Sequence, residues 1–538
     1  GEFAFVNSLF PLAVRANVDA DPRDGEVRAF ETEGFNLEPA DPVASPPVPQ
    51  VTMVPVRSGE RVSLNRARVE ASAHVEFVER EPNDTASTAQ ELPIPAGVSG
   101  RIQPSEVETQ DVDHFRFTAR QGVPLTLEVF ARRLGSPLDS VIEILDDRGE
   151  LLPRTTLRSV AETYTELRDH DSRSKGIRLH NWEDLLPGDL VMLGGELVKV
   201  QILPLGPDED VKFFDRGGLR LGYLGTTPEA HALNRAAYKV EVHPAGTVFP
   251  PNGMPVVTLP WRNDDGGPAY QSDSVLFFDP PADGQYTVRL RDVRGRSGYD
   301  FVYRLVIRER QEDFRVTLDP ENPNVPRGGV LPVNVTVERL DDFNGPIEVR
   351  LEGLPAGFAS SITTIGPDLM TGVIQLAALP GTETPPPEAS LTWRGVATAR
   401  VRGEVRERRT TPAFGGHVLT VTSPPDLEVD VEPKVATIRP GEEVRFTAKI
   451  ARKNGFAGRV PVDVLNLPHG LRVLDVGLNG VLINENETSR SFVVTCDPWV
   501  TPGRWPFFAA ARVEAKNERH GSPLLTLEVP EPARVAGP

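Results

Sequence analysis

The chain has 538 residues, with 39% hydrophobic and 25% charged side chains and a formal net charge of −19. These apolar side chains suffice for several cores, which excludes wholesale disorder, and the length predicts about three to five domains of roughly 100 to 200 residues. The acidic balance argues against nucleic-acid binding, because a phosphate backbone is bound by a clustered positive surface.

The first 75 residues contain short strand-like runs interrupted by a proline-rich stretch, Asp41–Pro49. The strand candidates are Ala4–Val6, Pro11–Val14 and Val51–Val54. So many prolines cannot pair in a central strand. We interpret residues 1–75 as the C-terminal part of an upstream β domain plus a linker. The chain opens without an initiator Met or a basic region before an apolar stretch, so we expect any secretion signal to lie upstream.

Alternating patterns become clear after Phe77 and predict strands. In Asp111–Phe117, the odd positions carry two aspartates and then two phenylalanines, which share one face of an extended strand. We expect the phenylalanines to enter a core and the carboxylates to lie at its rim. The segments Leu125–Val129 and Tyr286–Leu290 also alternate and predict half-buried strands. Tyr286, two residues after Gly284, predicts either a tyrosine corner or a plain core tyrosine.

Several spaced motifs follow one another in an ordered series, and their combination is more specific than any one of them. They are Glu79–Thr85, Gly100–Ile102, Asp111–Phe115 and Gly135–Asp139. Together they resemble the bacterial pre-peptidase C-terminal domain, in the versions found in large surface proteins of planctomycete-type bacteria. In that family the pattern continues through Asp-x-x-Gly to an Asn-Asp-Asp turn and a Gly-x-Tyr strand. Here these elements are Asp146–Gly149, Asn263–Asp265 and Gly284–Tyr286. The resemblance implies one β-sandwich built from residues 76–152 and 261–310.

Residues 153–260 therefore interrupt that module, and we predict a separate small β-barrel-like insert there. Gly194-Gly195 stands between two β-rich runs and marks a two-residue hairpin. If the flanking strands belong to one sandwich, Pro153 and Leu259 must lie close together. The insert either determines which partner the protein binds or only adds stability.

The last 225 residues or so repeat at an offset of 113. The first copy has these residues: Asp313, Val316, Pro320, Gly328, Arg339, Phe343, Gly345, Val349, Leu354, Pro355 and Gly357. They recur as Asp426, Val429, Pro433, Gly441, Arg452, Phe456, Gly458, Val462, Leu467, Pro468 and Gly470. A repeat of this length is typical of an immunoglobulin-like sandwich, so we predict one domain at 311–424 and another at 425–538.

Two smaller features of these copies carry expectations. Pro380–Ser390 is too rich in proline for a strand and predicts an exposed loop. Cys496 is the single cysteine, which excludes an internal disulfide, and its alternating surroundings predict a buried apolar role rather than a reactive thiol. The predicted fold class is therefore all-β, with consecutive β-sandwich modules, one of them interrupted by the insert.

The strongest candidate for chemistry is a set of oxygen-bearing side chains in two of the motifs. Glu79, Glu81 and Asn83 share one side of an extended segment and could face Asp111 and Asp113, with Asp84 beside them. Such a set suits calcium and is too poor in nitrogen and sulfur for zinc. In the resembled family, the collagen-binding modules of clostridial collagenases bind calcium through this segment and a later Asp pair. The alternative is a capped turn with solvated aspartates.

Other polar groups have simpler explanations. Asn263, Asp264 and Asp265 precede two glycines and are explained by turn chemistry, with a metal contact as the alternative. His170, near Asp171 and His180, lies in a polar stretch that predicts a loop. Hydrolase and nucleotide-binding signatures are missing from the sequence, so we predict no enzymatic activity.

The sequence leaves three functions open. The first is a binding or adhesion segment, outside the cell or at its surface or in the periplasm, that binds an extracellular polymer, glycan or protein. The second is a structural spacer, and the third is the accessory C-terminal region of a secreted peptidase. No apolar run approaches the roughly 18 residues that span a bilayer, so we expect no membrane span. Only five tryptophans are available for a stacked glycan platform: Trp182, Trp261, Trp393, Trp499 and Trp505.

Overall fold

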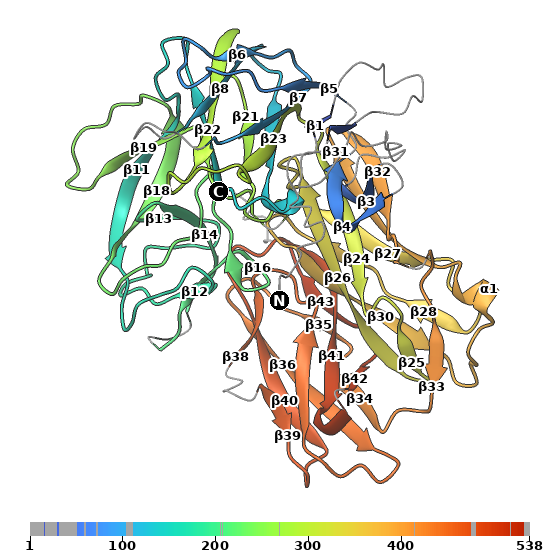
Figure 1. Ribbon diagram of the computed structural model, residues 1–538. Helices are drawn as coiled ribbons and strands as arrows, with labels where there is room; N and C mark the ends of the chain where they lie inside the picture. The colour runs from blue at the N-terminus through green and yellow to red at the C-terminus, as the bar shows by residue number, and fades with distance from the viewer. Residues whose placement is uncertain are drawn as a thin grey trace, which may run out of the picture. The chain divides into compact units, whose positions relative to one another are not determined.

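The computed structural model describes residues 74–103, 111–204, 206, 208–267, 269–413, 415–474, 480–516 and 518–531. In residues 1–73 it describes only the backbone of two strand pairs, β1 (Arg15–Ala16) with β2 (Phe30–Glu31) and β3 (Val51–Ser58) with β4 (Arg61–Glu70). The predicted strand Val51–Val54 lies within β3, whereas Ala4–Val6 and Pro11–Val14 lie outside the described residues. The chain divides into two compact units, 1–311 and 312–538 (Figure 1).

The first complete module is a sandwich of two five-stranded sheets. One sheet has the order β20-β10-β22-β8-β6, with bounds Arg262–Asn263, Ser140–Leu145, Gly284–Asp292, Asp113–Ala119 and Gln90–Glu91. The other has the order β21-β9-β23-β7-β5, with bounds Val275–Phe278, Leu125–Phe130, Val302–Glu309, Ala96–Arg101 and Val75–Val78. Both sheets therefore combine strands from before and after residues 153–260.

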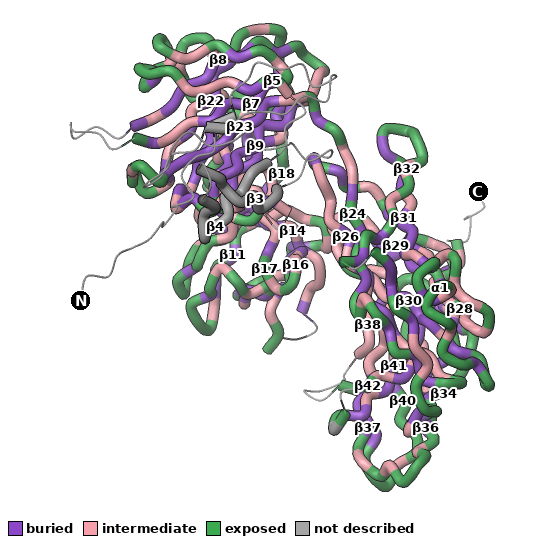
Figure 2. The backbone as a smooth tube through the Cα atoms, turned by 45° about the vertical axis from the view of Figure 1, so that its right-hand side comes forward, coloured by how far each residue is buried: buried purple, intermediate pink, exposed green. Residues whose placement is uncertain are grey.

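Aromatic and branched side chains from the two sheets fill the space between them. Phe115 and Phe117 of β8 are buried there, as the alternation predicted, together with Trp261 and Phe278. In Figure 2 the buried residues follow the strands, whereas most connecting loops are exposed. The Tyr286 hydroxyl donates to the carbonyl oxygen of Ala282 at 2.8 Å, which is the backbone bond of a tyrosine corner.

Residues 153–260 form their own seven-stranded sheet with the order β12-β15-β14-β13-β18-β11-β19. The bounds are Gly176–Ile177, Val211–Phe213, Glu196–Ile202, Leu190–Leu193, Ala236–Pro244, Pro153–Tyr164 and Val256–Pro260, and β16 (Asp215–Arg216) pairs with β17 (Leu219–Arg220) beside it. The pairing path is open, with β12 and β19 as its end strands. Leu193 pairs with Glu196, so Gly194-Gly195 is a two-residue turn, as predicted.

The two ends of the inserted segment lie side by side. Pro153 pairs with Pro260, and Thr155 pairs with Leu259, between the first and last strands of the insert. The chain therefore leaves the sandwich and returns to it at one place, which is the condition that an insertion requires. Trp261 follows at once and packs into the core of the sandwich.

The second unit contains two sandwiches whose strands correspond one to one. The first copy comprises β24 (Asp313–Asp319), β25 (Asn324–Pro326), β26 (Val330–Leu340), β27 (Ile347–Glu352), β28 (Phe358–Ser360), β29 (Thr363–Ile365), β30 (Thr371–Ala378), β31 (Arg394–Val401), β32 (Glu404–Arg409) and β33 (Thr420–Thr422). The second comprises β34 (Leu427–Glu432), β35 (Val435–Thr437), β36 (Glu443–Arg452), β37 (Val460–Leu465), β38 (Leu471–Leu474), β39 (Val481–Ile483), β40 (Ser489–Cys496), β41 (Gly503–Val513), β42 (Glu518–Gly521) and β43 (Leu525–Val529).

The main pairing paths are the same in both copies. The path β24-β26-β30-β28 corresponds to β34-β36-β40-β38, and β29-β27-β31-β32 corresponds to β39-β37-β41-β42. The pair β25-β33 is parallel, as is β35-β43. The two copies differ in one pairing, because β43 also pairs with β41, whereas β33 pairs only with β25. The consecutive β-sandwich fold class is confirmed.

The aromatic residues of the repeat occupy equivalent positions. A Cβ atom on Gly345 would lie 2.9 Å from the ring of Phe343, and one on Gly458 would lie 2.9 Å from the ring of Phe456. In each copy a glycine two residues on therefore makes room for the phenylalanine. Cys496 is buried in the core of the second copy, as predicted.

Helix is scarce in this chain. The proline-rich stretch predicted as a loop ends in one helical turn, α1 (Pro387–Ser390), because a proline is well suited to the first position of a helix. The other helical elements are single 3-10 turns, η1 (Arg132–Leu134) and η2 (Glu514–Lys516). Within the described residues, no helix has the length and apolar character that crossing a bilayer requires.

Candidate metal centre

The segment that carries the acidic motif crosses from one sheet of the first sandwich to the other. It follows β5, which pairs with β7, and leads to β6, which pairs with β8. The backbone N–H of Glu79 donates to the carbonyl of Ser99 at 3.0 Å, and the N–H of His114 donates to the carbonyl of Asn83 at 3.1 Å. The segment is thereby attached to both sheets, at the point where β8 begins with Asp113.

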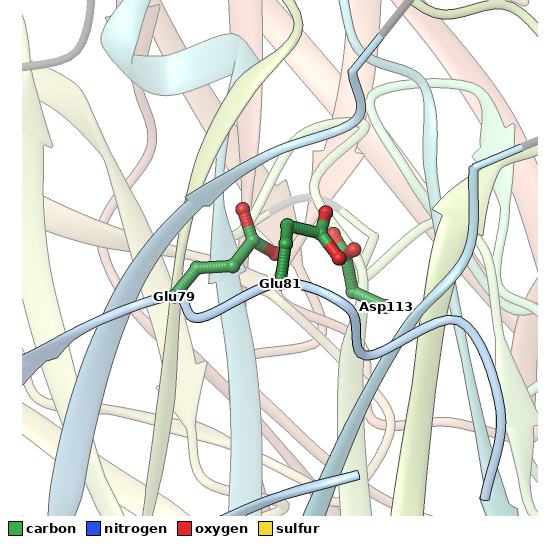
Figure 3. A group of neighbouring side chains, drawn as sticks. All are labelled: Glu79, Glu81 and Asp113. Carbon is green, nitrogen blue, oxygen red and sulfur yellow. The ribbon is translucent and has the colours of Figure 1, made fainter. Parts of the chain in front are cut away.

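Three carboxylates converge at this crossing. One oxygen of each of Glu79, Glu81 and Asp113 lies within 4.8 Å of the others. Figure 3 shows the three side chains reaching toward one another from the crossing segment and from the start of β8. Glu81 is exposed, Glu79 is half-buried and Asp113 is fully buried, so the group extends from the surface into the interior.

A buried tyrosine joins two of these carboxylates. The hydroxyl of Tyr303, in β23, lies 2.8 Å from Glu79 Oε1 and 2.5 Å from Asp113 Oδ2. A phenol has one proton and can donate to only one carboxylate at a time. Burial, with the charges of Asp113 and Glu79, raises the pKa of Tyr303, which therefore stays protonated. The second carboxylate thus requires a proton or a cation.

Two oxygen atoms in this cluster are buried without a hydrogen-bond partner, Asn83 Oδ1 and Asp113 Oδ1. The other polar atoms of Asn83 are engaged: its Nδ2 donates to Glu79 Oε1 at 3.2 Å, and its backbone N–H donates to Glu81 Oε2 at 2.9 Å. A buried acceptor without a donor costs free energy, and most such atoms are satisfied. Acceptor-only oxygens facing a cluster of carboxylates suit a bound cation.

The raised pKa values of the acidic residues in the cluster also favour a bound cation. Burial raises the pKa of Asp113 well above its usual value, and the charges of Glu79 and Asp111 add to the effect. Burial also raises the pKa of Asp111 to about 7, despite a hydrogen bond from the backbone N–H of Gln103, with further contributions from Glu81 and Glu79. Burial likewise raises the pKa of Glu81. A divalent cation would compensate this repulsion.

A cavity borders two of the three carboxylates, Glu79 and Glu81. A cavity of about 60 Å³ is lined by Val78, Glu79, Glu81, Ser99, Gly100, Arg101 and Gln103. Its size exceeds the ~10–15 Å³ that one water needs. Gly100 keeps part of this region open, because a Cβ atom there would lie 2.5 Å from the Tyr303 hydroxyl and 2.9 Å from Glu79 Cδ.

The six residues predicted from sequence are placed as follows. Glu79, Glu81 and Asp113 converge, Asn83 bonds Glu79, and Asp111 is buried and accepts from the backbone N–H of Gln103. Asp84 is exposed and interacts with the carboxyl of Asp111. The expectation that the aspartates lie at the rim is wrong for Asp113, which is fully buried. The residues gather because a loop crosses between two sheets, not because two extended strands face each other.

Sequence reasoning missed Tyr303 and Gln103, and it named Gly100 as part of a motif without giving it a role at the cluster. Tyr303 lies more than 200 positions from Glu79 in the chain, and its strand, β23, pairs with β7, which carries Gly100. Gln103 extends its side chain to Glu81 Oε1 at 3.3 Å. Only the pairing of β23 with β7 brings the tyrosine to the cluster, and no local motif marks it.

The second acidic group is explained by turn chemistry. Asn263 Oδ1 accepts from the N–H of Val275 at 2.9 Å, and its Nδ2 donates to the carbonyl of Asp265 at 2.9 Å. Asp264 bonds the hydroxyl of Thr227. Burial, with the charges of Asp264, Asp139 and Asp273, raises the pKa of Asp265 to about 6. Asn263 thus bonds both within the turn and to β21, and Asp264 bonds Thr227 of the insert.

The histidines near residue 170 also differ from expectation. His170 is buried rather than exposed in a loop, because its backbone pairs with that of His231. His180 remains exposed, where its ring stacks on Tyr164 with centroids 4.5 Å apart and its Nδ1 lies 3.3 Å from Glu166.

The fold and the cluster together define a chain of consecutive β-sandwich modules with convergent carboxylates in the first. No family model matches the chain, and no curated protein matches it. Among solved structures, it is similar to one described as "Structures of Clostridium thermocellum CbhA fibronectin(III)-like modules". That similarity covers 41% of this chain and 97% of the other, at 13% identity and a TM-score of 0.14, and it adds no argument to the fold described above.

Proposed function

We propose that this chain is a non-catalytic, extracytoplasmic binding or adhesion segment of a larger bacterial surface or secreted protein. In this proposal, residues 76–152 and 261–310 form a calcium-binding module similar to the pre-peptidase C-terminal domain. The observation that carries the proposal is the convergence of Glu79, Glu81 and Asp113 beside two buried oxygens that lack donors.

The donor atoms decide which cation fits. The proposed ligands come from Glu79, Glu81, Asn83, Asp84, Asp111 and Asp113, and all of them are oxygens. Calcium accepts six to eight oxygen ligands with variable geometry, whereas zinc sites use mainly nitrogen and sulfur. A bound calcium would neutralise the repelling carboxylates and fasten the crossing segment to both sheets. Tyr303 and Gln103 hold two of these carboxylates, those of Glu79 and Glu81, in place through hydrogen bonds.

Isothermal titration of the full chain with calcium, after treatment with a chelator, tests this proposal. We expect saturable binding of one or two ions, weakened at least tenfold by Asp113→Asn and by Glu79→Gln. Asp264→Asn is the matched control, because Asp264 belongs to the acidic turn and should leave the titration unchanged. The absence of binding at about 1 mM calcium, the weak end of the range for extracellular modules, would refute the proposal.

A structural spacer is the second candidate, and the burial of the tryptophans favours it. Trp261 and Trp393 are buried, and Trp182 and Trp505 pack against core clusters. Trp499 alone among the five is exposed, at 38%, and it lies beside His469. A strip of stacked tryptophans for a glycan therefore has little support. Screening the chain against glycans and surface proteins distinguishes an adhesion segment, which should bind one of them, from a spacer, which should not. The sequence upstream of this chain would test the third function, an accessory region of a secreted peptidase.

A further inference from the structure

Two arginines face each other on neighbouring strands in the last sandwich. Arg512 of β41 is paired in register with Arg519 of β42, and the two strands are antiparallel. Side chains of such a pair lie on the same face with Cβ atoms about 4.5–5.5 Å apart, where like charges destabilise a sheet. An arrangement of this kind requires a compensating negative charge.

Neither arginine has such a compensating partner within the described residues. Every arginine described in 312–538 donates to a carboxylate or a carbonyl, except Arg445, Arg512 and Arg519. The Nε of Arg512 is buried and unbonded. Asp463, on the next strand, is opposite Ala510 and makes no ion pair with either arginine in the described part of the chain.

Arg519 lines a groove of about 800 Å³ within the second unit. The groove runs between residues 319–334 and 422–426 on one side and the β42 region on the other. His520, also in its wall, is 4% exposed, and both of its ring nitrogens lack a hydrogen-bond partner. The groove thus presents a guanidinium that has no ion-pair partner within the described residues.

The acidic side chains of the groove, in contrast, are already engaged. Asp426 bonds Lys516 and accepts from Asn454 at 2.9 Å. Asp319 accepts from Asn334 at 3.5 Å. Glu518 lies 3.8 Å from His520 Nε2. Arg519 is therefore the basic side chain of the groove without an ion-pair partner within the described residues, and Arg512 is paired beside it on β41, outside the lining of the groove.

We infer that this groove binds an oxyanion, namely a carboxylate, sulfate or phosphate, through Arg519, with Arg512 beside it supplying the second positive charge. A guanidinium offers two parallel N–H donors that match two oxygens of such a group. This site is independent of the proposed calcium site, because it lies in another module and uses other residues.

The test uses the full chain and follows the arginine Nε–Hε resonances by NMR during titration with sodium sulfate, sodium phosphate or a galacturonic acid oligomer. Sodium chloride at equal ionic strength corrects for screening. We expect saturable shifts at Arg512 and Arg519, weakened at least tenfold by Arg519→Gln or Arg512→Gln. Arg445→Gln is the matched control, because Arg445 is an exposed, unpaired arginine of the same sandwich without an opposing arginine. The three titrants distinguish the source of the oxyanion.

A second variant, Arg519→Glu, tests the inference through the melting temperature, which does not depend on how tightly the oxyanion binds. Arg519→Glu should raise the melting temperature of the unliganded protein by about 2 °C or more, because it replaces a like-charged pair with an ion pair. It should also abolish the resonance shifts at Arg512. Shifts equal to those in sodium chloride, or equal loss in Arg445→Gln, would overturn the inference, as would a melting temperature that falls in Arg519→Glu.

Discussion

Arg339 and Arg452 make equivalent contacts at corresponding positions of the two copies. Arg339 Nη1 donates to the carbonyl of Gly345 at 2.6 Å, and Arg452 Nε donates to the carbonyl of Gly458 at 3.0 Å. Each guanidinium also bonds two further carbonyls in the segment before the next strand of its sheet, those of Gly366 and Leu369 in one copy and of Asn484 and Glu487 in the other. One planar side chain thus fastens two loops in each sandwich.

Removing either guanidinium should therefore destabilise its own sandwich. We expect Arg339→Met and Arg452→Met each to lower the free energy of unfolding by about 2 kcal/mol, because carbonyls lose charged donors. Denaturant unfolding of the full chain measures both. Arg445→Met, at an exposed arginine without a partner, is the control and should change stability by less than about 0.5 kcal/mol. Equal losses in the control would contradict the assignment.

Gly100→Ala should damage the carboxylate cluster without altering any charge. The new methyl group would lie 2.5 Å from the Tyr303 hydroxyl and must displace it or Glu79. Residues that orient metal ligands typically change affinity by about 10–100-fold, so we expect calcium binding to weaken by about tenfold. Gly284→Ala serves as the control, because no atom lies within 4 Å of its added Cβ. Unchanged calcium affinity in Gly100→Ala would count against the site.

The stability of the calcium-free module should fall as the pH rises from about 4 to about 7. An aspartate in an unfolded chain titrates near pH 3.9, whereas burial raises the pKa of Asp111 to about 7 and that of Asp113 well above its usual value. The folded state therefore holds more protons than the unfolded state in this window, so stability declines with pH. The free energy of unfolding in chelator, measured at pH 5 and pH 8, checks this. Asp111→Asn should reduce the difference between the two values.

A buried network in the inserted sheet makes a further prediction. Glu196 is fully buried and accepts from Arg220 Nε at 2.8 Å, from the N–H of Glu229 at 3.0 Å and from His231 Nε2 at 2.7 Å. Burial raises its pKa, but the bonds from His231 and Arg220 outweigh that effect and lower it. Glu196→Gln leaves Arg220 buried without its counter-charge, which should cost about 3–5 kcal/mol. Glu241→Gln, at an exposed carboxylate, is the control in thermal unfolding.

The repeat made the last two sandwiches predictable from sequence. Positions such as Gly345 and Phe343 recur at one offset because each fills a fixed place in the same packing. The turn at Gly194-Gly195 and the Tyr286 corner were predictable for a similar reason, since both depend on contacts within a few residues. The Glu196 network was not predictable, because the partners of Glu196 lie 24 to 35 residues from it in the chain and carry no shared pattern.

The candidate site was only partly predictable. Two local motifs identified the carboxylates, and the spacing of Glu79 and Glu81 placed them on one side of a segment. The depth of Asp113 and the role of Tyr303 depend on how β23, β7 and β8 are assembled into two sheets. That assembly depends on the whole sandwich, so no local sequence pattern predicts it.

Calorimetric melting of the full chain with calcium and with chelator tests the central claim most directly. If the dissociation constant is near 10 μM and calcium is near 1 mM, linkage predicts about 2.7 kcal/mol of stabilisation for the first sandwich. We expect its transition to move down on chelation in the parent protein and to be insensitive to calcium in the double variant Asp111→Asn, Asp113→Asn. An unchanged melting temperature of the parent on chelation would contradict the account, and the cluster would then be a set of solvated and protonated carboxyls.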